Sequence, residues 1–280
     1  MNYERYPWLR DLSSLEACAA IEEARKCYQT TGAAIFPQIL TDEALQSCIQ
    51  DAQAQEDTAF TTDDVHTAYL RPINPDVSPR SVQNFAMRTQ VASIAFDELG
   101  TQSTLAEFYR QPALRELVAR VVGKKEIYLS EDPLGCCSIN VFRPGYHHSF
   151  HFDESEFSTT LMLQEASDRS SGLFQYTNPL RDSPNDMALP LVAATIRTYD
   201  PTVTAQDYGF DEQSDIIPSL HTLHFQPGTL SIFAGSKSLH RVTRVEGTCS
   251  RLVAVLTFAS VPGFRNSPAV QKLFWGRSLP

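Results

Sequence analysis

The chain has 280 residues, enough for one large domain or two small ones, and its 42% apolar and 20% charged residues are ordinary for a soluble globular protein. A formal net charge of −10 argues against a nucleic acid partner, because phosphates bind basic surfaces. No window approaches the apolar length of a membrane span, and the amino-terminal MNYERYPWLRD is no secretion leader, so we expect a cytoplasmic protein without a membrane partner.

The amino-terminal part of the chain is predicted to be mainly helical. Residues 14–32 carry apolar positions at helical spacing and end at a glycine, and residues 32–40 follow as a short strand. Residues 41–55 form the next predicted helix, with Thr41 as its N-cap. Residues 56–90 show no clear period and contain several prolines, so we expect a long loop with a functional role.

A further helix is predicted by four apolar residues at helical spacing before Gly123: Leu114, Leu117, Val118 and Val121. The pattern then changes to short apolar runs between turn residues, which is typical of an antiparallel sandwich or barrel. The predicted strands are EIYL, CCSINVF, TTLMLQ, LFQY, HTLHF, TLSIF and RLVAVLTFA. Residues 179–218 interrupt these runs with prolines and aspartates, and we interpret them as a lid-like insertion at one end.

These elements favour a single domain over residues 1–280, with helices packed on a β core. Residues 1–124 would supply the supporting helices and the substrate loop. Residues 125–280 would supply the β core together with the insertion.

A histidine and an acid stand two positions apart in the stretch HHSFHFDESEF. In an extended segment His151 and Asp153 point to the same side, while Phe150 and Phe152 face the core on the other side. Taken alone, such a pair is more often an ion pair or hydrogen bond at the rim of a strand than a metal site.

A second histidine and an arginine follow on later predicted strands. His240 comes after the strand GTLSIF and a Gly-Ser turn, and Arg251 opens the strand LVAVLTF. An arginine at the start of an apolar strand is costly unless it binds an anion, and its planar fork matches a carboxylate. Two histidines and one carboxylate leave three open positions on a metal, which favours non-haem Fe(II).

The motif HFD at residues 151–153, the later SLHRV around His240 and the downstream Arg251 resemble the motifs of the Fe(II)/2-oxoglutarate-dependent oxygenases. Their order and spacing and the GTLSIF lead-in also resemble that family. The resemblance covers roughly residues 125–260, with a family-like helical part before them. It implies the family's double-stranded β-helix, a cupin-like jelly roll, packed against amino-terminal helices.

The resemblance also implies a cofactor site and a reaction. His151, Asp153 and His240 would hold Fe(II), Arg251 would bind the distal carboxylate of 2-oxoglutarate, and Asn140 would donate a hydrogen bond to the keto acid. The expected reaction uses O2 to hydroxylate an unactivated C–H bond and releases succinate and CO2. Ascorbate would serve as the reductant in vitro.

Within that family, the remaining polar residues resemble the branch of free-lysine radical halogenases and lysine hydroxylases. The residues expected to bind the substrate are Arg88, Asp132, His148, Glu154, Thr257 and Trp275. The arginine, threonine and tryptophan would bind the α-carboxylate of a free amino acid, with L-lysine as the first candidate. The acids would bind its ammonium groups, with Glu131 as an alternative to Asp132. Because Asp153 stands where the halogenases of this branch have glycine, hydroxylation is favoured over chlorination.

Structural interpretations compete for each of these residues. Arg88 suits a salt bridge in a loop, Trp275 suits packing of the carboxyl-terminal tail, and Glu154 suits a solvated strand end. Strict alternation along a strand places His148 opposite His151, unless the backbone bends between them. The remaining histidines are interpreted as surface or structural residues: His66, His147, His221 and His224.

Two other classes of function compete with lysine hydroxylation. One is an oxygenase that acts on another polar metabolite, such as arginine, ornithine or a nucleoside. The other is a zinc or manganese jelly-roll protein without redox chemistry, and that class would leave Arg251 without a role. The expected partner is the small-molecule substrate, with a homodimer as the alternative to a monomer.

Overall fold

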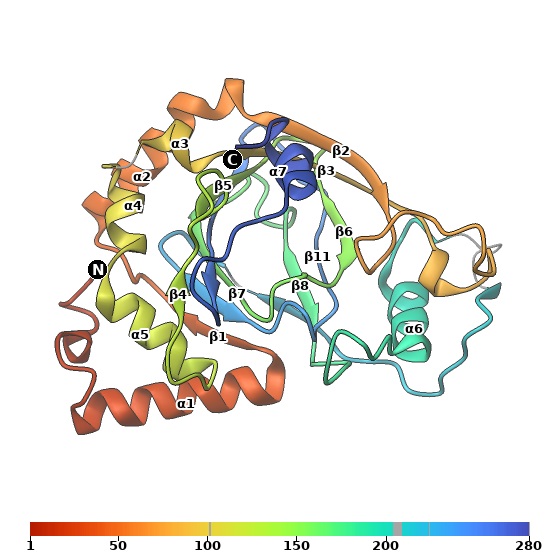
Figure 1. The fold of residues 1–280 in the computed structure, drawn as a ribbon, viewed down its shortest axis with the longest axis horizontal. Helices are drawn as coiled ribbons and strands as arrows, with labels where there is room; N and C mark the ends of the chain where they lie inside the picture. The colour runs from red at the N-terminus through yellow and green to blue at the C-terminus, as the bar shows by residue number, and fades with distance from the viewer. Residues whose placement is uncertain (101, 204–208, 224, 280) are drawn as a thin grey trace.

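Two antiparallel sheets dominate the computed structural model, which describes residues 1–100, 102–203, 209–223 and 225–279 (Figure 1). The larger sheet has seven strands in the order β1-β10-β7-β12-β5-β3-β2, and the smaller sheet has four in the order β6-β11-β8-β9. Most neighbouring strands in each sheet are not consecutive in the chain, as in a jelly roll. The predicted jelly-roll fold with packed helices is confirmed.

Most strands coincide with the apolar runs seen in the sequence. The larger sheet contains β1 (Ala33–Phe36), β10 (Leu230–Phe233), β7 (Ser158–Gln164), β12 (Arg251–Leu256), β5 (Cys137–Phe142), β3 (Met87–Ile94) and β2 (Phe60–His66). The smaller sheet contains β6 (His148–His151), β11 (His240–Val242), β8 (Phe174–Thr177) and β9 (Leu220–Leu223). A separate pair joins β13 (Phe258–Ala259) to β4 (Tyr128–Leu129).

The amino-terminal helices begin and end where the sequence predicts. The Ser14 hydroxyl caps α1 (Leu15–Thr31), which ends at Gly32 in the left-handed region, and the Thr41 hydroxyl caps α2 (Asp42–Gln55). Among the described residues the other helices are η1 (Pro7–Arg10), η2 (Glu56–Thr58), η3 (Val82–Asn84), α3 (Phe96–Leu99), α4 (Thr104–Tyr109), α5 (Pro112–Val121), α6 (Leu189–Tyr199) and α7 (Pro268–Trp275). Within the described ranges, no helix combines the length and apolarity that crossing a membrane requires.

The larger sheet separates the main hydrophobic core from the interior of the jelly roll. Helices α1, α2, α4 and α5 lie along its outer face (Figure 1), and Leu252 and Leu256 of β12 join their core. Val253, on the alternate face of β12, joins an inner cluster with Phe142 and Phe233. The inner face of this sheet therefore looks toward the smaller sheet.

The prediction of a loop over residues 56–90 was wrong. That segment contains β2 and the start of β3, which pair over seven residue pairs from Phe60↔Ser93 to His66↔Met87. The strand β2 (FTTDDVH) was missed because neither of its faces is apolar, so it lacks the alternation that marks a half-buried strand.

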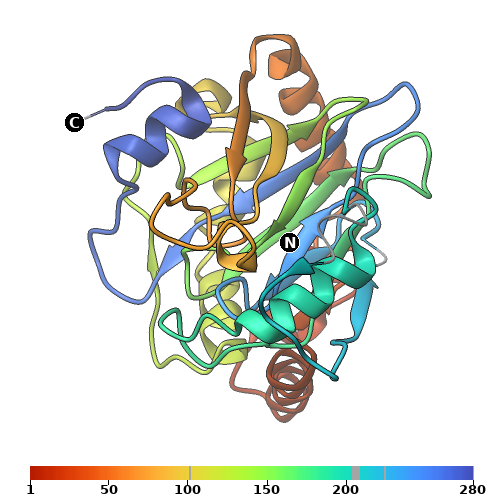
Figure 2. The same cartoon turned by 90° about the vertical axis from the view of Figure 1, so that its right-hand side faces the viewer.

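The predicted insertion at residues 179–218 supports the smaller sheet from outside. Its helix α6 buries Val192 and Ile196 in a cluster with Phe150 and Phe152, on the face of β6 away from the interior. Figure 2, seen from that side, shows α6 in front of the sheets. The helix therefore supports the smaller sheet from outside. Residues 204–208 of the predicted insertion lie outside the described part of the chain.

Asp132 is a structural residue in this fold, which overturns the prediction that it binds a substrate ammonium group. It is fully buried, and its Oδ1 accepts hydrogen bonds from the backbone N–H groups of Leu134 (2.9 Å) and Gly135 (2.6 Å). Its Oδ2 accepts from the backbone N–H of Asn266 (2.8 Å) and from Nε2 of Gln271 (2.9 Å). The carboxylate thereby ties the turn before β5 to α7 and has no face open to a substrate.

We predict that Asp132→Ala lowers the free energy of unfolding by at least about 3 kcal/mol, because each buried donor left without an acceptor costs about 1–3 kcal/mol. Denaturant unfolding of the purified variant would measure this. Glu131→Ala, at the exposed neighbouring acid, is the matched control and should change stability by less than about 0.5 kcal/mol. Equal stability of the two variants would contradict a structural role for Asp132.

Candidate metal centre

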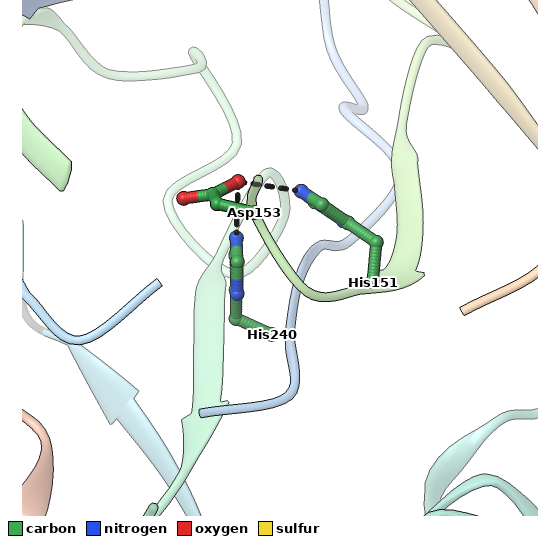
Figure 3. A group of neighbouring side chains, drawn as sticks. All are labelled: His151, Asp153 and His240. Atoms are coloured by element: carbon green, nitrogen blue, oxygen red, sulfur yellow. Dashed lines mark ion pairs between the residues drawn. The ribbon is translucent and has the colours of Figure 1, made fainter. Parts of the chain in front are cut away.

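Antiparallel pairing of β6 with β11 sets His151 directly opposite His240. Asp153 follows two residues after His151, and its backbone N–H donates to the carbonyl of Gly235 at 3.0 Å. One oxygen of Asp153, Oδ1, lies 3.4 Å from Nε2 of His151 and 3.4 Å from Nε2 of His240 (Figure 3). The three potential ligand atoms all lie within 4.8 Å of one another, which is close enough to share one metal ion.

Backbone carbonyls fix which nitrogen of each histidine faces the centre. Nδ1 of His151 lies 2.8 Å from the carbonyl of Ser149, and Nδ1 of His240 lies 2.9 Å from the carbonyl of Ser238. A carbonyl only accepts hydrogen bonds, so Nδ1 carries the proton in both rings. Nε2 is then left with its lone pair directed at Asp153, as metal ligation requires.

The protonation of the centre also suits a cation. Burial lowers the pKa of His151 to about 4, so its imidazole is neutral near neutral pH. Burial alone would raise the pKa of Asp153, but the neighbouring imidazoles of His240 and His151 outweigh burial, and that pKa falls well below its usual range. The centre therefore offers two imidazoles and one carboxylate, which is the donor set of a facial 2-His-1-carboxylate site.

The strict alternation expected along β6 is broken, and His148 lies beside His151. The register matches His240 with His151 but Val242 with His148, so three residue steps on β6 face two on β11. This bulge turns His148 inward, where its ring stacks on the His151 ring with centroids 3.7 Å apart and planes 14° from parallel. Phe150 stays on the outer face, fully buried under Arg241.

His66 also borders the centre, although the sequence indicated only a surface or structural role. Its ring lies 5.9 Å from that of His148 and 6.4 Å from that of His151. Its Nδ1 donates to the carbonyl of Thr67 at 2.9 Å, so its Nε2 accepts from the Thr89 hydroxyl at 2.7 Å. The spacing of Thr62, Asp64 and His66 on one face of β2 was the signal that could have placed it. His224, which was also interpreted as a surface or structural residue, lies outside the described residues.

Arg251 is a buried cation that forms no ion pair with any of the described residues, although the charge of Glu165 acts on it from the same cavity. It opens β12 on the inner face, is 2% exposed, and its guanidinium lies over the rings of Phe142 and Phe225 at 5.3 and 5.9 Å. In the described part of the chain its Nε has no hydrogen-bond partner and no acid lies within ion-pair distance. Burial lowers its pKa to about 9, which reflects the cost of holding this charge away from water.

A small cavity reaches the Arg251 side chain. Its wall includes Met162, Glu165, Gly172 and Phe174. A methyl group placed on Gly172 would approach the Arg251 Cδ to 3.1 Å, so the glycine leaves room beside the guanidinium. The arrangement provides a narrow space beside the Arg251 side chain, and the other arginine in its wall, Arg169, forms an ion pair with Glu165.

Asn140 lies on the same inner face as Arg251. It belongs to β5, where it stands opposite Val253 of β12, two residues from Arg251. Its Oδ1 accepts a long hydrogen bond from the Ser93 hydroxyl at 3.4 Å, which orients the amide. The two residues predicted to bind the keto acid are therefore placed on neighbouring strands, facing the same interior.

The predicted substrate clamp is only partly assembled. Arg88 lies on β3 rather than in a loop, on the face opposite Thr89, and pairs with Asp63 through Nε–Oδ1 and Nη2–Oδ2 contacts of 2.7 and 2.6 Å. Its side chain is 58% exposed. Arg88 therefore points away from the centre, and the prediction that it binds a substrate carboxylate is wrong. Glu154 is exposed one residue beyond Asp153, as a solvated strand end would be.

Thr257 and Trp275 meet at Gly135. The Thr257 hydroxyl donates to the Gly135 carbonyl at 2.9 Å, and a methyl group on Gly135 would lie 2.5 Å from the Trp275 ring. Trp275 packs in a buried cluster with Ala95 and Leu134, so it does hold α7 on the body of the protein. Its Nε1 is buried without a hydrogen-bond partner among the described residues, which leaves one donor unused.

The comparison with known proteins found similar solved structures, but no family model and no curated protein matches the sequence. The non-heme alpha ketoglutarate dependent epimerase SnoN from nogalamycin biosynthesis is 13% identical, with a TM-score of 0.58 over 94% of this chain and 96% of that one. AviO1 from Streptomyces viridochromogenes Tue57 is 11% identical, with a TM-score of 0.55 over 90% and 98%. HygX from Streptomyces hygroscopicus is 13% identical, with a TM-score of 0.51 over 85% and 86%. The chain therefore shares the fold of these proteins.

We predict that Arg251→Met raises the free energy of unfolding of the ligand-free protein by about 1–4 kcal/mol, because an apolar side chain of similar length replaces a buried charge. Denaturant unfolding would measure the change. Arg88→Met, at an exposed ion pair, is the control and should alter stability by less than about 1 kcal/mol. A less stable Arg251→Met protein would show that the guanidinium is not an uncompensated charge.

Proposed function

We propose that this protein is an Fe(II)/2-oxoglutarate-dependent oxygenase. The proposal is carried by one observation: the triad of His151, Asp153 and His240 shares its interior with a buried arginine, Arg251, that has no acid within ion-pair distance in the described part of the chain. A zinc or manganese enzyme without redox chemistry would use the triad but would leave the cost of Arg251 unexplained. A dicarboxylic keto acid accounts for both, because one end chelates a metal and the other pairs with a guanidinium.

The structural neighbours support this assignment of cofactor and cosubstrate. SnoN has been solved in complex with Fe3+, alpha ketoglutarate and nogalamycin RO, with a TM-score of 0.55 to this chain. HygX has been solved with nickel, 2-oxoglutarate and hygromycin B bound. In this chain the residues that would hold iron are His151 and His240 through Nε2 and Asp153 through Oδ1.

The iron would supply oxygen activation, coupled to oxidation of 2-oxoglutarate to succinate and CO2. One oxygen atom of O2 enters succinate and the other enters the substrate as a hydroxyl group. The protein's own part is to bind and orient. Arg251 would bind the distal carboxylate in the cavity beside Gly172, and Asn140 would donate to the keto acid from the neighbouring strand. The surrounding apolar side chains, among them Phe142 and Phe233, exclude water from the reacting groups.

A free amino acid, with L-lysine first, is the substrate that we propose. The resemblance of the sequence to the lysine branch supports it, and so does an unpaired acid on the inner face of β2. Asp64 lies between Thr62, whose hydroxyl donates to the Leu273 carbonyl of α7, and His66 beside the centre. It is half-buried and forms no ion pair in the described part of the chain, and a carboxylate so placed suits an ammonium group.

The other end of the substrate has fewer candidate partners than the sequence indicated. With Arg88 facing outward and Asp132 saturated, the donors left for a carboxylate are His148 and the unused Nε1 of Trp275 beside Thr257. This arrangement supports a cationic substrate more directly than it supports an α-carboxylate clamp. Arginine and ornithine share the cationic group and therefore belong in the same test.

The test is mass spectrometry of the protein incubated in air with Fe(II), ascorbate, 2-oxoglutarate and a pool of free amino acids that includes lysine, arginine and ornithine. We predict a gain of one oxygen atom on lysine that requires 2-oxoglutarate and is matched by succinate. If succinate forms and the product keeps the mass of the substrate, the reaction would be an epimerisation instead of a hydroxylation. If succinate forms and the product has lost two hydrogen atoms, the reaction would be a cyclisation. Absence of succinate under all conditions would contradict the oxygenase assignment.

Two neighbouring acids provide the matched variants for this assay. Asp153→Gly should abolish hydroxylation, because it removes the carboxylate ligand of the iron. Glu154→Ala, one residue further and exposed, should keep the 2-oxoglutarate-dependent formation of succinate. Full activity of Asp153→Gly would remove this residue from the metal centre.

A further inference from the structure

The two oxygen atoms of Asp153 have different surroundings. Oδ1 faces the two histidines, whereas Oδ2 points away from both of them in Figure 3 and accepts a hydrogen bond from the hydroxyl of Ser158. Ser158 is the first residue of β7, and Phe233 of β10 lies opposite it. The hydroxyl is therefore carried by a strand in the middle of the larger sheet, which gives Asp153 a rigid partner.

A second serine fixes the direction of that hydrogen bond. The hydroxyl oxygens of Ser155 and Ser158 lie 3.1 Å apart. Ser158 has a single hydroxyl proton, and the carboxylate of Asp153 only accepts. Ser158 consequently donates to Asp153, and Ser155 donates to Ser158.

Gly235 closes the other side of the carboxylate. Its carbonyl accepts from the Asp153 backbone N–H, and a methyl group placed on its Cα would collide with Oδ2 and lie 2.8 Å from the Asp153 Cγ and 2.7 Å from the Ser158 hydroxyl. Gly235 is not among the glycines with a positive φ, so its backbone conformation suits other residues. What a side chain would remove at this position is the space that the carboxylate occupies.

These contacts bear on how many coordination positions Asp153 takes. A carboxylate binds a metal through one oxygen or through two, and the two-oxygen mode occupies one more position. A facial 2-His-1-carboxylate centre works with its three remaining positions open. With Oδ2 held by Ser158 in the space beside Gly235, only Oδ1 is directed toward the two histidines.

We infer that Ser158 and Gly235 are positioning residues that restrict Asp153 to coordination through Oδ1 alone. The inference rests on the proposed metal centre and deepens it, because it assigns the residues that keep the third open position available. Ser158 acts through its hydrogen bond to Oδ2, and Gly235 acts by leaving the room in which Oδ2 sits.

The test uses Co(II) and Mn(II) as probes, so that it does not depend on turnover. We predict that Ser158→Ala weakens Co(II) binding about 10- to 100-fold, as the loss of a hydrogen bond to a metal ligand typically does. The Mn(II)-loaded variant should carry one bound water fewer than the wild type, counted from the broadening of the EPR lines in 17O-water. Ser158→Thr keeps the hydroxyl and should restore both the affinity and the water count.

Thr160→Val is the matched control, because it removes a hydroxyl from the next residue on the same face of β7. It should leave both readouts unchanged, and Thr160→Val and the two Ser158 variants should unfold in the absence of metal within a few degrees of the wild type. Gly235→Ala should lose metal affinity at least as strongly as Ser158→Ala. If Gly235→Ala fails to fold, the variants Ser158→Ala, Ser158→Thr and Thr160→Val still test the inference.

Two results would overturn the inference while leaving the metal centre in place. One is a Ser158→Ala protein that matches Thr160→Val in affinity and water count. The other is a loss of affinity that Ser158→Thr does not restore, which would indicate packing rather than a hydrogen bond. A wild-type protein that binds neither Co(II) nor Mn(II) would instead remove the metal centre itself, and the positioning role with it.

Discussion

The pairing of β6 with β11 determines where every other part of the candidate centre lies. It places His151 opposite His240 with ring centroids 4.2 Å apart, so that both Nε2 atoms converge on Asp153. The strands themselves are held from both sides. Phe150 and Phe152 anchor β6 in the outer cluster with α6, and Phe174 and Phe233 pack against the His240 ring from the interior. A site built on strands with packed partners keeps its geometry better than one built on loops.

The same interior imposes a cost on the buried charge of Arg251 that a bound anion would offset. Arg251 holds its charge among Phe142, Phe225 and other apolar side chains, and the interior offers it no acid at ion-pair distance within the described ranges. Natural sequences seldom retain a buried unpaired charge for stability, since an apolar residue of similar size serves better. Under the proposed function the arginine would bind an anion, and the metal centre on the facing sheet favours a ligand with an acid at one end and a chelating group at the other.

The sequence predicted the elements whose local pattern is strong. Helices α1 and α2 carry capped, amphipathic repeats, and most strands of the jelly roll are apolar runs. It failed at β2, because a strand with one face toward a polar site and the other toward solvent shows no apolar alternation. That failure also hid His66, which reaches the centre only through the pairing of β2 with β3.

The residues of the site were predictable to the extent that their chemistry is specific. His151, Asp153 and His240 were identified because few other side chains ligate iron, and the structure brings them together. Arg88 was misassigned because the side of the strand on which it lies depends on the strand register. Asp132 was misassigned because its burial depends on hydrogen-bond donors that are distant in the sequence. Ser158 and Gly235 carry no chemical signal in the sequence. The β-bulge that turns His148 inward leaves no trace in the hydrophobic pattern of the sequence, so it could not be predicted.

The most direct test of the central claim is an anaerobic absorption titration with Fe(II) and 2-oxoglutarate. Our account predicts a weak visible band from chelation by the keto acid, which saturates at one equivalent of iron in the wild type. Arg251→Met should require a concentration of 2-oxoglutarate at least about tenfold higher, because a charged hydrogen-bonded pair contributes about 1.5–3 kcal/mol. A wild-type protein that binds Fe(II) but gives no band with 2-oxoglutarate would contradict the account and would favour a metal protein without this cosubstrate.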